Sequence, residues 1–201
     1  MNDSKAMASY IGCLSLLEFN TAQLYGSLSE KTENPFAKSL LLSIAQDSSK
    51  HSTLLKGIVK SITNSEVKSK ECAKHLGQVW RAVTTYIDEV KTIKVGELFM
   101  ADLYEKLITL ESSLGEEYYI FVQMQTLQRL TKEINQNYKI DLSNVKSVFE
   151  NIISDENRHI EILVRLKALS EPKEKARDYT PLLKYQNPDQ WIDYASKSPE
   201  P

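Results

Sequence analysis

The stretch SDENRHIEIL, residues 154–163, has a counterpart far upstream in AQDSSKHSTL, residues 45–54. Aligning the two on Asp155 and Asp47 also makes their histidines coincide. Side chains three or four residues apart share one face of a helix, so the acid and the histidine of each stretch point the same way if both are helical. The pair therefore indicates a repeated helical element with an Asp-x-x-x-His pattern.

The repeat extends to the segments that precede these two stretches. Residues 18–25 are EFNTAQLY and residues 111–118 are ESSLGEEY, so in both a glutamate is followed seven residues later by a tyrosine. Each half of the chain thus carries a helix with Glu-x6-Tyr and then a helix with Asp-x3-His. The sequence predicts an internal duplication of a helical hairpin.

The rest of the sequence favours an all-α fold. The 201 residues suit one domain, and six glycines and six prolines are few for this length. Apolar residues recur at helical spacing in four long segments and in an added helix after the second. These segments are about residues 6–30, 35–62, 102–134 and a last one that starts at Asp141 or Ser143 and ends near residue 169, and the added helix begins at a capping-box pattern at Thr63. We expect an up-down-up-down four-helix bundle over residues 1–170, with the added helix in the connection between the second and third helices.

The C-terminal segment, residues 171–201, differs in composition. It is rich in proline, but its aromatic content is too high for a solvated disordered segment. The aromatic residues are Tyr179, Tyr185, Trp191 and Tyr194. We expect an irregular tail that docks on the bundle. It is also a candidate contact for a homodimer or another partner.

Charge, hydropathy and cysteine spacing exclude several classes of protein. A formal net charge of -2 gives no basic field for nucleic acid. There is no apolar run of about 18 residues and no secretory leader, so we expect no membrane segment and a cytoplasmic location. Cys13 and Cys72 fit no paired metal-binding spacing and are expected to be reduced thiols packed as small hydrophobes.

Three glutamates stand where an apolar side chain is expected. Glu18, Glu111 and Glu156 each interrupt a stripe of leucines or isoleucines that should face the core. Unpaired carboxylates in a core are costly unless they are protonated or find a cation. Carboxylate oxygens supplemented by imidazoles suit hard or borderline ions, so we expect iron, with manganese or zinc as alternatives. The seven-residue spacing also places Tyr25 and Tyr118 in the core, with hydroxyls that bond a carboxylate.

Carboxylates and one histidine on each of two helix pairs are the pattern of di-iron bundles. The sequence resembles a ferritin-like di-iron carboxylate protein of the rubrerythrin type without a rubredoxin domain, over about residues 6–169. The resemblance implies terminal ligands at Glu18 and Glu111, imidazole ligands at His51 and His159, and a bridging carboxylate at Glu156.

One position departs from that family pattern. The second bridging glutamate should fall at Ser48, so the site supplies three negative charges instead of four. Asp47, one turn before His51, is a further candidate metal ligand. A hydroxide beside Ser48 is another source of the missing charge.

The resemblance implies an oxidoreductase that holds two iron ions and acts on dioxygen or peroxide. Because the chain has no Cys-x-x-Cys module, electrons would come from a separate donor. Two other hypotheses stand beside this one. The site could hold a single non-redox ion at Glu111, Glu156 and His159, or the bundle could bind no metal and serve a structural or protein-interaction role.

Overall fold

The computed structural model describes residues 2–63, 68–93, 101–123 and 143–170. Within these ranges the chain forms helices and no strand, so the predicted all-α fold is confirmed for them. The helices are α1 (Asn2–Lys31), α2 (Pro35–Ile62), α3 (Ser69–Thr92), α4 (Ala101–Gln123) and α6 (Ser143–Ser170). The predicted C-terminal tail and the predicted extension of α4 to about residue 134 lie outside the described residues.

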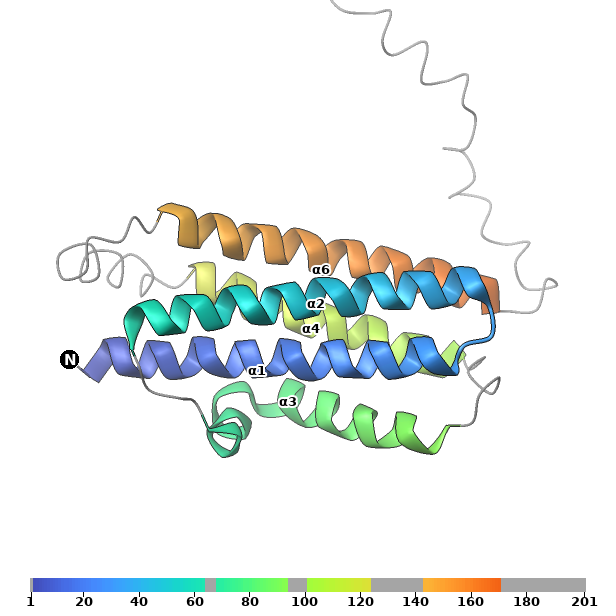
Figure 1. The fold of residues 1–201 in the computed structure, drawn as a ribbon, viewed down its shortest axis with the longest axis horizontal. Helices are drawn as coiled ribbons and strands as arrows, with labels where there is room; N and C mark the ends of the chain where they lie inside the picture. The colour runs from blue at the N-terminus through green and yellow to red at the C-terminus, as the bar shows by residue number, and fades with distance from the viewer. Residues whose placement is uncertain (1, 64–67, 94–100, 124–142, 171–201) are drawn as a thin grey trace, which may run out of the picture.

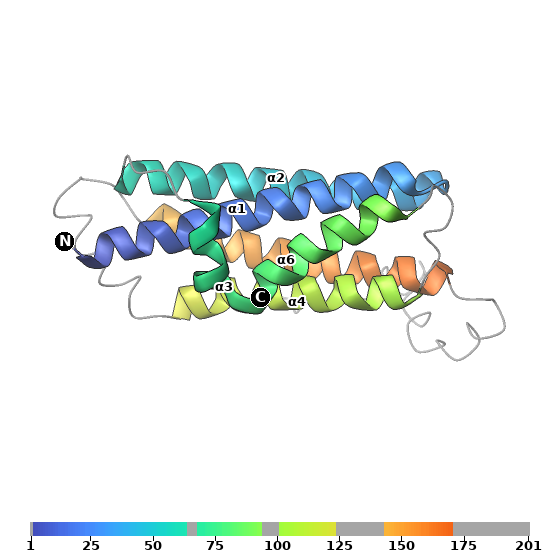
Figure 2. The ribbon, with the colours of Figure 1, turned by 90° about the horizontal axis from the view of Figure 1, so that it is seen from below.

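Helices α1, α2, α4 and α6 lie side by side as a bundle, and α3 packs on the outside of it (Figure 1). The pairs α1–α2 and α4–α6 make the closest packing, α2 also contacts α6, and α3 contacts α1 and α4. The predicted up-down-up-down order is wrong, because α4 runs in the same direction as α2 (Figures 1 and 2). The cause is α3, which crosses back along the bundle before α4 begins.

The sequence predicts the start of α2 correctly but not the start of α3. The Asn34 side chain accepts hydrogen bonds from the backbone N–H groups of Phe36 and Ala37 at 3.0 and 3.1 Å, and Pro35 opens α2, as predicted. Helix α3 begins at Ser69 instead of following a cap at Thr63, and residues 64–67 lie outside the described residues.

Helix α3 is bent at Gly77, where the backbone φ angle is +52° (Figure 2). Side chains with a Cβ rarely adopt this left-handed conformation, so glycine is the residue suited to it. The bend lets α3 leave the end of α2 across the bundle and then turn along it. It thereby sets the direction in which α4 enters.

A disulfide joins Cys13 of α1 to Cys72 of α3, so the prediction of two reduced thiols is wrong. Both cysteines are buried, as predicted. They are 59 residues apart in sequence, and the return of α3 over α1 brings their Cα atoms to 5.0 Å, within the reach of a disulfide. The predicted cytoplasmic location stays a prediction, and disulfides are uncommon in that compartment. None of the helices in the described ranges is both long and apolar enough to cross a membrane.

Candidate metal centre

The five side chains predicted as principal ligands meet in the core of the bundle. Each is at most 1% exposed, although all are polar. They are Glu18 on α1, His51 on α2, Glu111 on α4, and Glu156 and His159 on α6. Their helices place them there because each ligand interrupts an otherwise apolar stripe, and burying the stripe carries the acid or imidazole inward.

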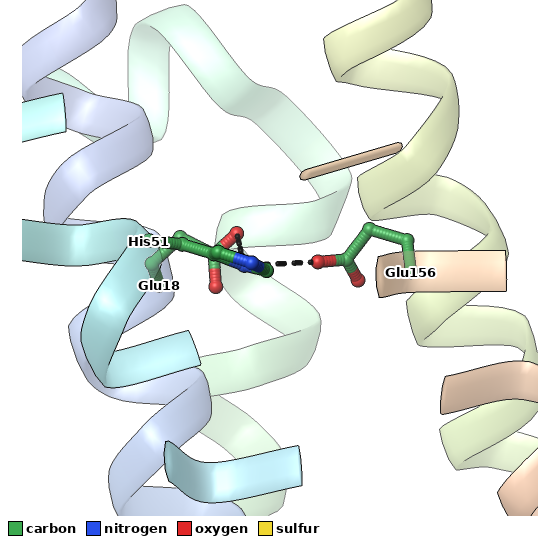
Figure 3. A group of neighbouring side chains, drawn as sticks. All are labelled: Glu18, His51 and Glu156. Atoms are coloured by element: carbon green, nitrogen blue, oxygen red, sulfur yellow. Dashed lines mark ion pairs between the residues drawn. The ribbon is translucent and has the colours of Figure 1, made fainter. Parts of the chain in front are cut away.

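The five side chains form two groups that share one glutamate. Glu18, His51 and Glu156 form the first group, and in each group the candidate ligand atoms lie within 4.8 Å of one another. His51 Nδ1 lies 3.5 Å from Glu18 Oε1 and 3.4 Å from Glu156 Oε1 (Figure 3). Figure 3 shows the imidazole between the two carboxylates, which come from different helices.

The second group consists of Glu111, Glu156 and His159. His159 Nδ1 lies 3.1 Å from Glu111 Oε2 and 3.6 Å from Glu156 Oε2. One oxygen of Glu156 therefore faces His51 and the other faces His159. This is the arrangement expected of a carboxylate that joins two ions.

Many polar atoms of this core have no hydrogen-bond partner. In the described ranges the unpartnered buried atoms are Glu18 Oε2, Glu111 Oε1, both carboxylate oxygens of Glu156, His51 Nδ1, and the hydroxyl oxygens of Thr21, Tyr25 and Ser48. A buried polar atom without a partner costs about 1–3 kcal/mol. Metal coordination would satisfy the carboxylate oxygens and the imidazole nitrogen, and this mixed oxygen and nitrogen donor set fits divalent iron, manganese or zinc.

Two aspartates contact the outer nitrogens of the histidines, and each does so across the helix pair. Asp155 Oδ2 on α6 lies 2.8 Å from Nε2 of His51 on α2. Asp47 Oδ2 on α2 lies 3.5 Å from Nε2 of His159 on α6. A carboxylate on the outer nitrogen fixes the orientation of the ring and directs its other nitrogen inward.

Two basic side chains cover these aspartates at the surface. Lys50 Nζ lies 2.9 Å from Asp47 and 3.0 Å from Asp155, and an Arg158 nitrogen lies 2.6 Å and 3.1 Å from the same two residues. Partial burial works to raise the pKa of both aspartates, but their hydrogen bonds to Lys50 and the histidines outweigh it and lower the pKa. The aspartates are therefore ionised at neutral pH.

Asp47 lies outside both groups of candidate ligands. Its role as a metal ligand stays a prediction, and its contacts favour a different role, the orientation of His159. Sequence reasoning assigned no role to Asp155, although this residue occupies the position of Asp47 in the repeat. The repeat thus contained the signal for both.

Burial and neighbouring charges shift the proton affinities of the ligands in the metal-free site. Burial works to lower the pKa of His51, but the neighbouring carboxylates of Glu156 and Glu18 outweigh it and raise this pKa to about 10. The pKa of His159 is also raised, since its bond to Glu111 outweighs burial. Burial, and then the charges of Glu111 and Glu18, raise the pKa of Glu156 well above its usual range. Metal binding would therefore displace protons from three of the five ligands.

The two tyrosines of the repeat also lie in the core, fully buried. The Tyr118 hydroxyl on α4 donates to Glu18 Oε1 on α1 at 2.5 Å, which confirms the predicted bond to a carboxylate. The Tyr25 hydroxyl has no hydrogen-bond partner. Burial raises the pKa of both tyrosines, helped by the negative charge of Glu111 at Tyr25 and of Glu18 at Tyr118, so both hydroxyls stay neutral.

A cavity of about 350 Å³ opens between α2 and α6 beside His51. Its apolar wall is formed by Leu54, Val148 and Ile152, and Asp155 lies on its polar side. The cavity brings solvent or a small molecule to the edge of the first group.

Comparisons with protein-family models, curated proteins and solved structures find no match for this chain.

Proposed function

We propose that this protein is a ferritin-like oxidoreductase that binds two divalent metal ions, with iron as the working metal, and acts on dioxygen or peroxide. The observation that carries the proposal is the shared Glu156, whose two oxygens face two imidazoles in separate Glu/His groups. Neither a solvated acid nor a structural ion pair explains why two buried Glu/His groups share one carboxylate. The pairing of two helical hairpins through a crossover helix is consistent with a ferritin-like topology.

In this proposal Glu18 and His51 would hold one ion, Glu111 and His159 would hold the other, and Glu156 would contribute to both. Bound iron would supply one-electron redox chemistry toward dioxygen or peroxide. Because the candidate ligands are at most 1% exposed, the bundle excludes bulk water from the site. The cavity beside His51 is then the route by which a small reactant comes close.

Other side chains position these ligands. Asp155 and Asp47 orient the two imidazoles from outside, and the Tyr118 hydroxyl fixes one oxygen of Glu18. The described residues contain no free cysteine that could carry electrons to the site. A separate electron donor is therefore part of the proposal.

The test is metal analysis combined with absorption spectroscopy. Protein loaded anaerobically with ferrous iron should hold two ions per chain and develop a ligand-to-metal band on exposure to peroxide. The band should bleach on reduction and return with peroxide. Exposed Glu161 on α6 allows a matched control, because Glu161→Gln should retain both ions. If two ions bind but the absorption spectrum does not change with peroxide or dioxygen, the redox part of the proposal is wrong.

A single-ion, non-redox site is the second candidate, and Ser48 is the observation that favours it. Ser48 aligns with Glu156 in the repeat, so the first half of the chain has a hydroxyl where the second half has the bridging carboxylate. One equivalent of zinc per chain, unchanged when iron and manganese are supplied in excess, would support this candidate. If no metal binds and the melting temperature ignores chelators, the bundle has only a structural or interaction role.

A further inference from the structure

The charge of the centre does not balance when two ions are bound. Its groups contain three carboxylates, Glu18, Glu111 and Glu156, against four positive charges from two divalent ions. The imidazoles and the hydroxyl of Tyr118 are neutral when they serve as ligand or donor. A buried excess charge is costly, so the loaded core favours one additional anion.

Ser48 offers a hydroxyl donor at the position that corresponds to Glu156 in the repeat. The side chain is 1% exposed, its oxygen has no hydrogen-bond partner, and it lies three residues before His51 on the same helix face. Thr21 on α1 has the same property, a fully buried hydroxyl oxygen without a partner, one turn after Glu18.

The two hydroxyls lie on neighbouring helices near the same level. Helices α1 and α2 pack antiparallel, and their register is fixed by the Ser15 and Ser52 hydroxyls, each of which donates to the backbone carbonyl of the other at 2.9 and 2.8 Å. From that crossing, Thr21 lies six residues along α1 and Ser48 four residues back along α2, so they are within about one helical turn of each other in height. Hydroxyl donors from both α1 and α2 therefore lie at this height of the bundle, where they could serve one bound anion.

The acids that lie nearest are engaged elsewhere. Asp47, one residue from Ser48, contacts Lys50, Arg158 and the outer nitrogen of His159. Asp155 is held in the same way by the two basic residues and His51. Neither aspartate belongs to the groups that surround the ions.

We propose that the metal pair takes its fourth acidic ligand from outside the protein, as a carboxylate group that binds beside Ser48. This inference rests on the proposed two-ion centre and adds the substrate class, a small molecule that carries a carboxylate. Ser48, whose side chain is shorter than the glutamate at the corresponding position of the repeat, provides a donor for the bound oxygen.

The test uses the full chain loaded with cobalt(II), whose visible absorption reports on coordination without any turnover. Metal analysis first establishes how many ions are bound, and a value below two rejects the proposed function independently of this inference. The loaded protein is then titrated with sodium acetate, with perchlorate keeping the ionic strength constant. A saturable spectral change is expected.

Three variants make the test specific for Ser48. Ser48→Glu should bind two cobalt ions and show no acetate response, because its own carboxylate takes the place of acetate. Ser48→Ala should bind acetate about tenfold more weakly, since a hydrogen bond to a charged group is lost. Ser49→Glu adds the same charge on the exposed side of α2 and should respond as the parent does.

The parent protein decides the matter even if Ser48→Glu does not fold. A two-cobalt spectrum that ignores acetate overturns the inference and leaves solvent to balance the charge, as does a Ser48→Glu protein that responds like the parent. Formate, bicarbonate and hexanoate separate the two sources of a carboxylate. Similar affinities identify a small free anion, whereas tighter binding of hexanoate identifies an organic acid whose chain packs against the protein.

Discussion

Replacement of Glu156 by glutamine should separate metal binding from folding. In the metal-free protein burial and the charges of Glu111 and Glu18 raise the pKa of Glu156 and favour its protonated form, which glutamine matches in size and charge. The free energy of unfolding of the metal-free variant should therefore lie within about 1 kcal/mol of the parent. The bound state should differ strongly, because Glu156 belongs to both groups and glutamine supplies no charge to either ion.

The magnitude follows from mass action. Metal at a concentration 100 times its dissociation constant stabilises the parent by about 2.7 kcal/mol. For a chain of this length that corresponds to a rise in melting temperature of about 5 to 11 °C. We expect Glu156→Gln to lose this rise, while Glu161→Gln, the same change on an exposed part of α6, keeps it.

Differential scanning calorimetry with and without iron, manganese or zinc measures both states. A Glu156→Gln protein that still gains the full stabilisation from metal would show that the shared carboxylate is not a ligand. A metal-free variant destabilised by more than about 3 kcal/mol would show instead that Glu156 is part of the folding core, because losses of that size come from broken buried networks.

Four further predictions concern other parts of the structure. The raised pKa of His51 stabilises the metal-free protein below about pH 6.5, and this stability should be lost as the pH rises toward about 10. Metal affinity should increase over the same range, because binding displaces the proton. Thermal melts and calorimetric titrations at several pH values measure the two trends, and a pH-independent affinity would contradict the reasoning. Asp155→Asn should weaken metal binding about 10- to 100-fold by competition with a chelator, whereas Asp88→Asn on exposed α3 should not; equal effects would count against an orienting role. Tyr118→Phe should destabilise the metal-free protein by about 1.5–3 kcal/mol in urea, and Tyr25→Phe, whose hydroxyl has no partner, should cost less; the opposite order would be inconsistent with the hydrogen bond to Glu18. Replacing both cysteines with alanine should lower the unfolding free energy by about 4 kcal/mol for a closed loop of 59 residues, and a reductant should then have no further effect; an unchanged stability would mean that α3 is held by packing alone.

The parts of the fold and site that the sequence predicted are those with a local signal. The Asn34–Pro35 signal predicted the start of α2, and helical periodicity predicted its end at about Ile62, because both depend only on neighbours in the chain. The buried acids were predictable for the same reason, since Glu18 and Glu111 stand inside apolar stripes. The repeat then placed the two histidines beside them.

The parts that the sequence could not supply depend on distances across the fold. The direction of α4 follows from the path of α3, including its bend at Gly77, and no residue of α4 records it. The disulfide depends on the same path, which brings Cys13 to Cys72. The one-ion hypothesis grouped Glu156 only with Glu111 and His159. In the structure one oxygen of Glu156 lies 3.4 Å from His51 Nδ1 and the other lies 3.6 Å from His159 Nδ1.

Contacts at the centre run from one hairpin to the other, as Asp155 with His51 and Tyr118 with Glu18 show. A single hairpin would therefore need an antiparallel second copy of itself to assemble such a site, and any substitution in it would then appear twice. In one chain that carries both hairpins this constraint is absent, because each half can change alone. Ser48 at the position that corresponds to Glu156 is a difference of this kind, and it makes the two ends of the centre chemically unequal.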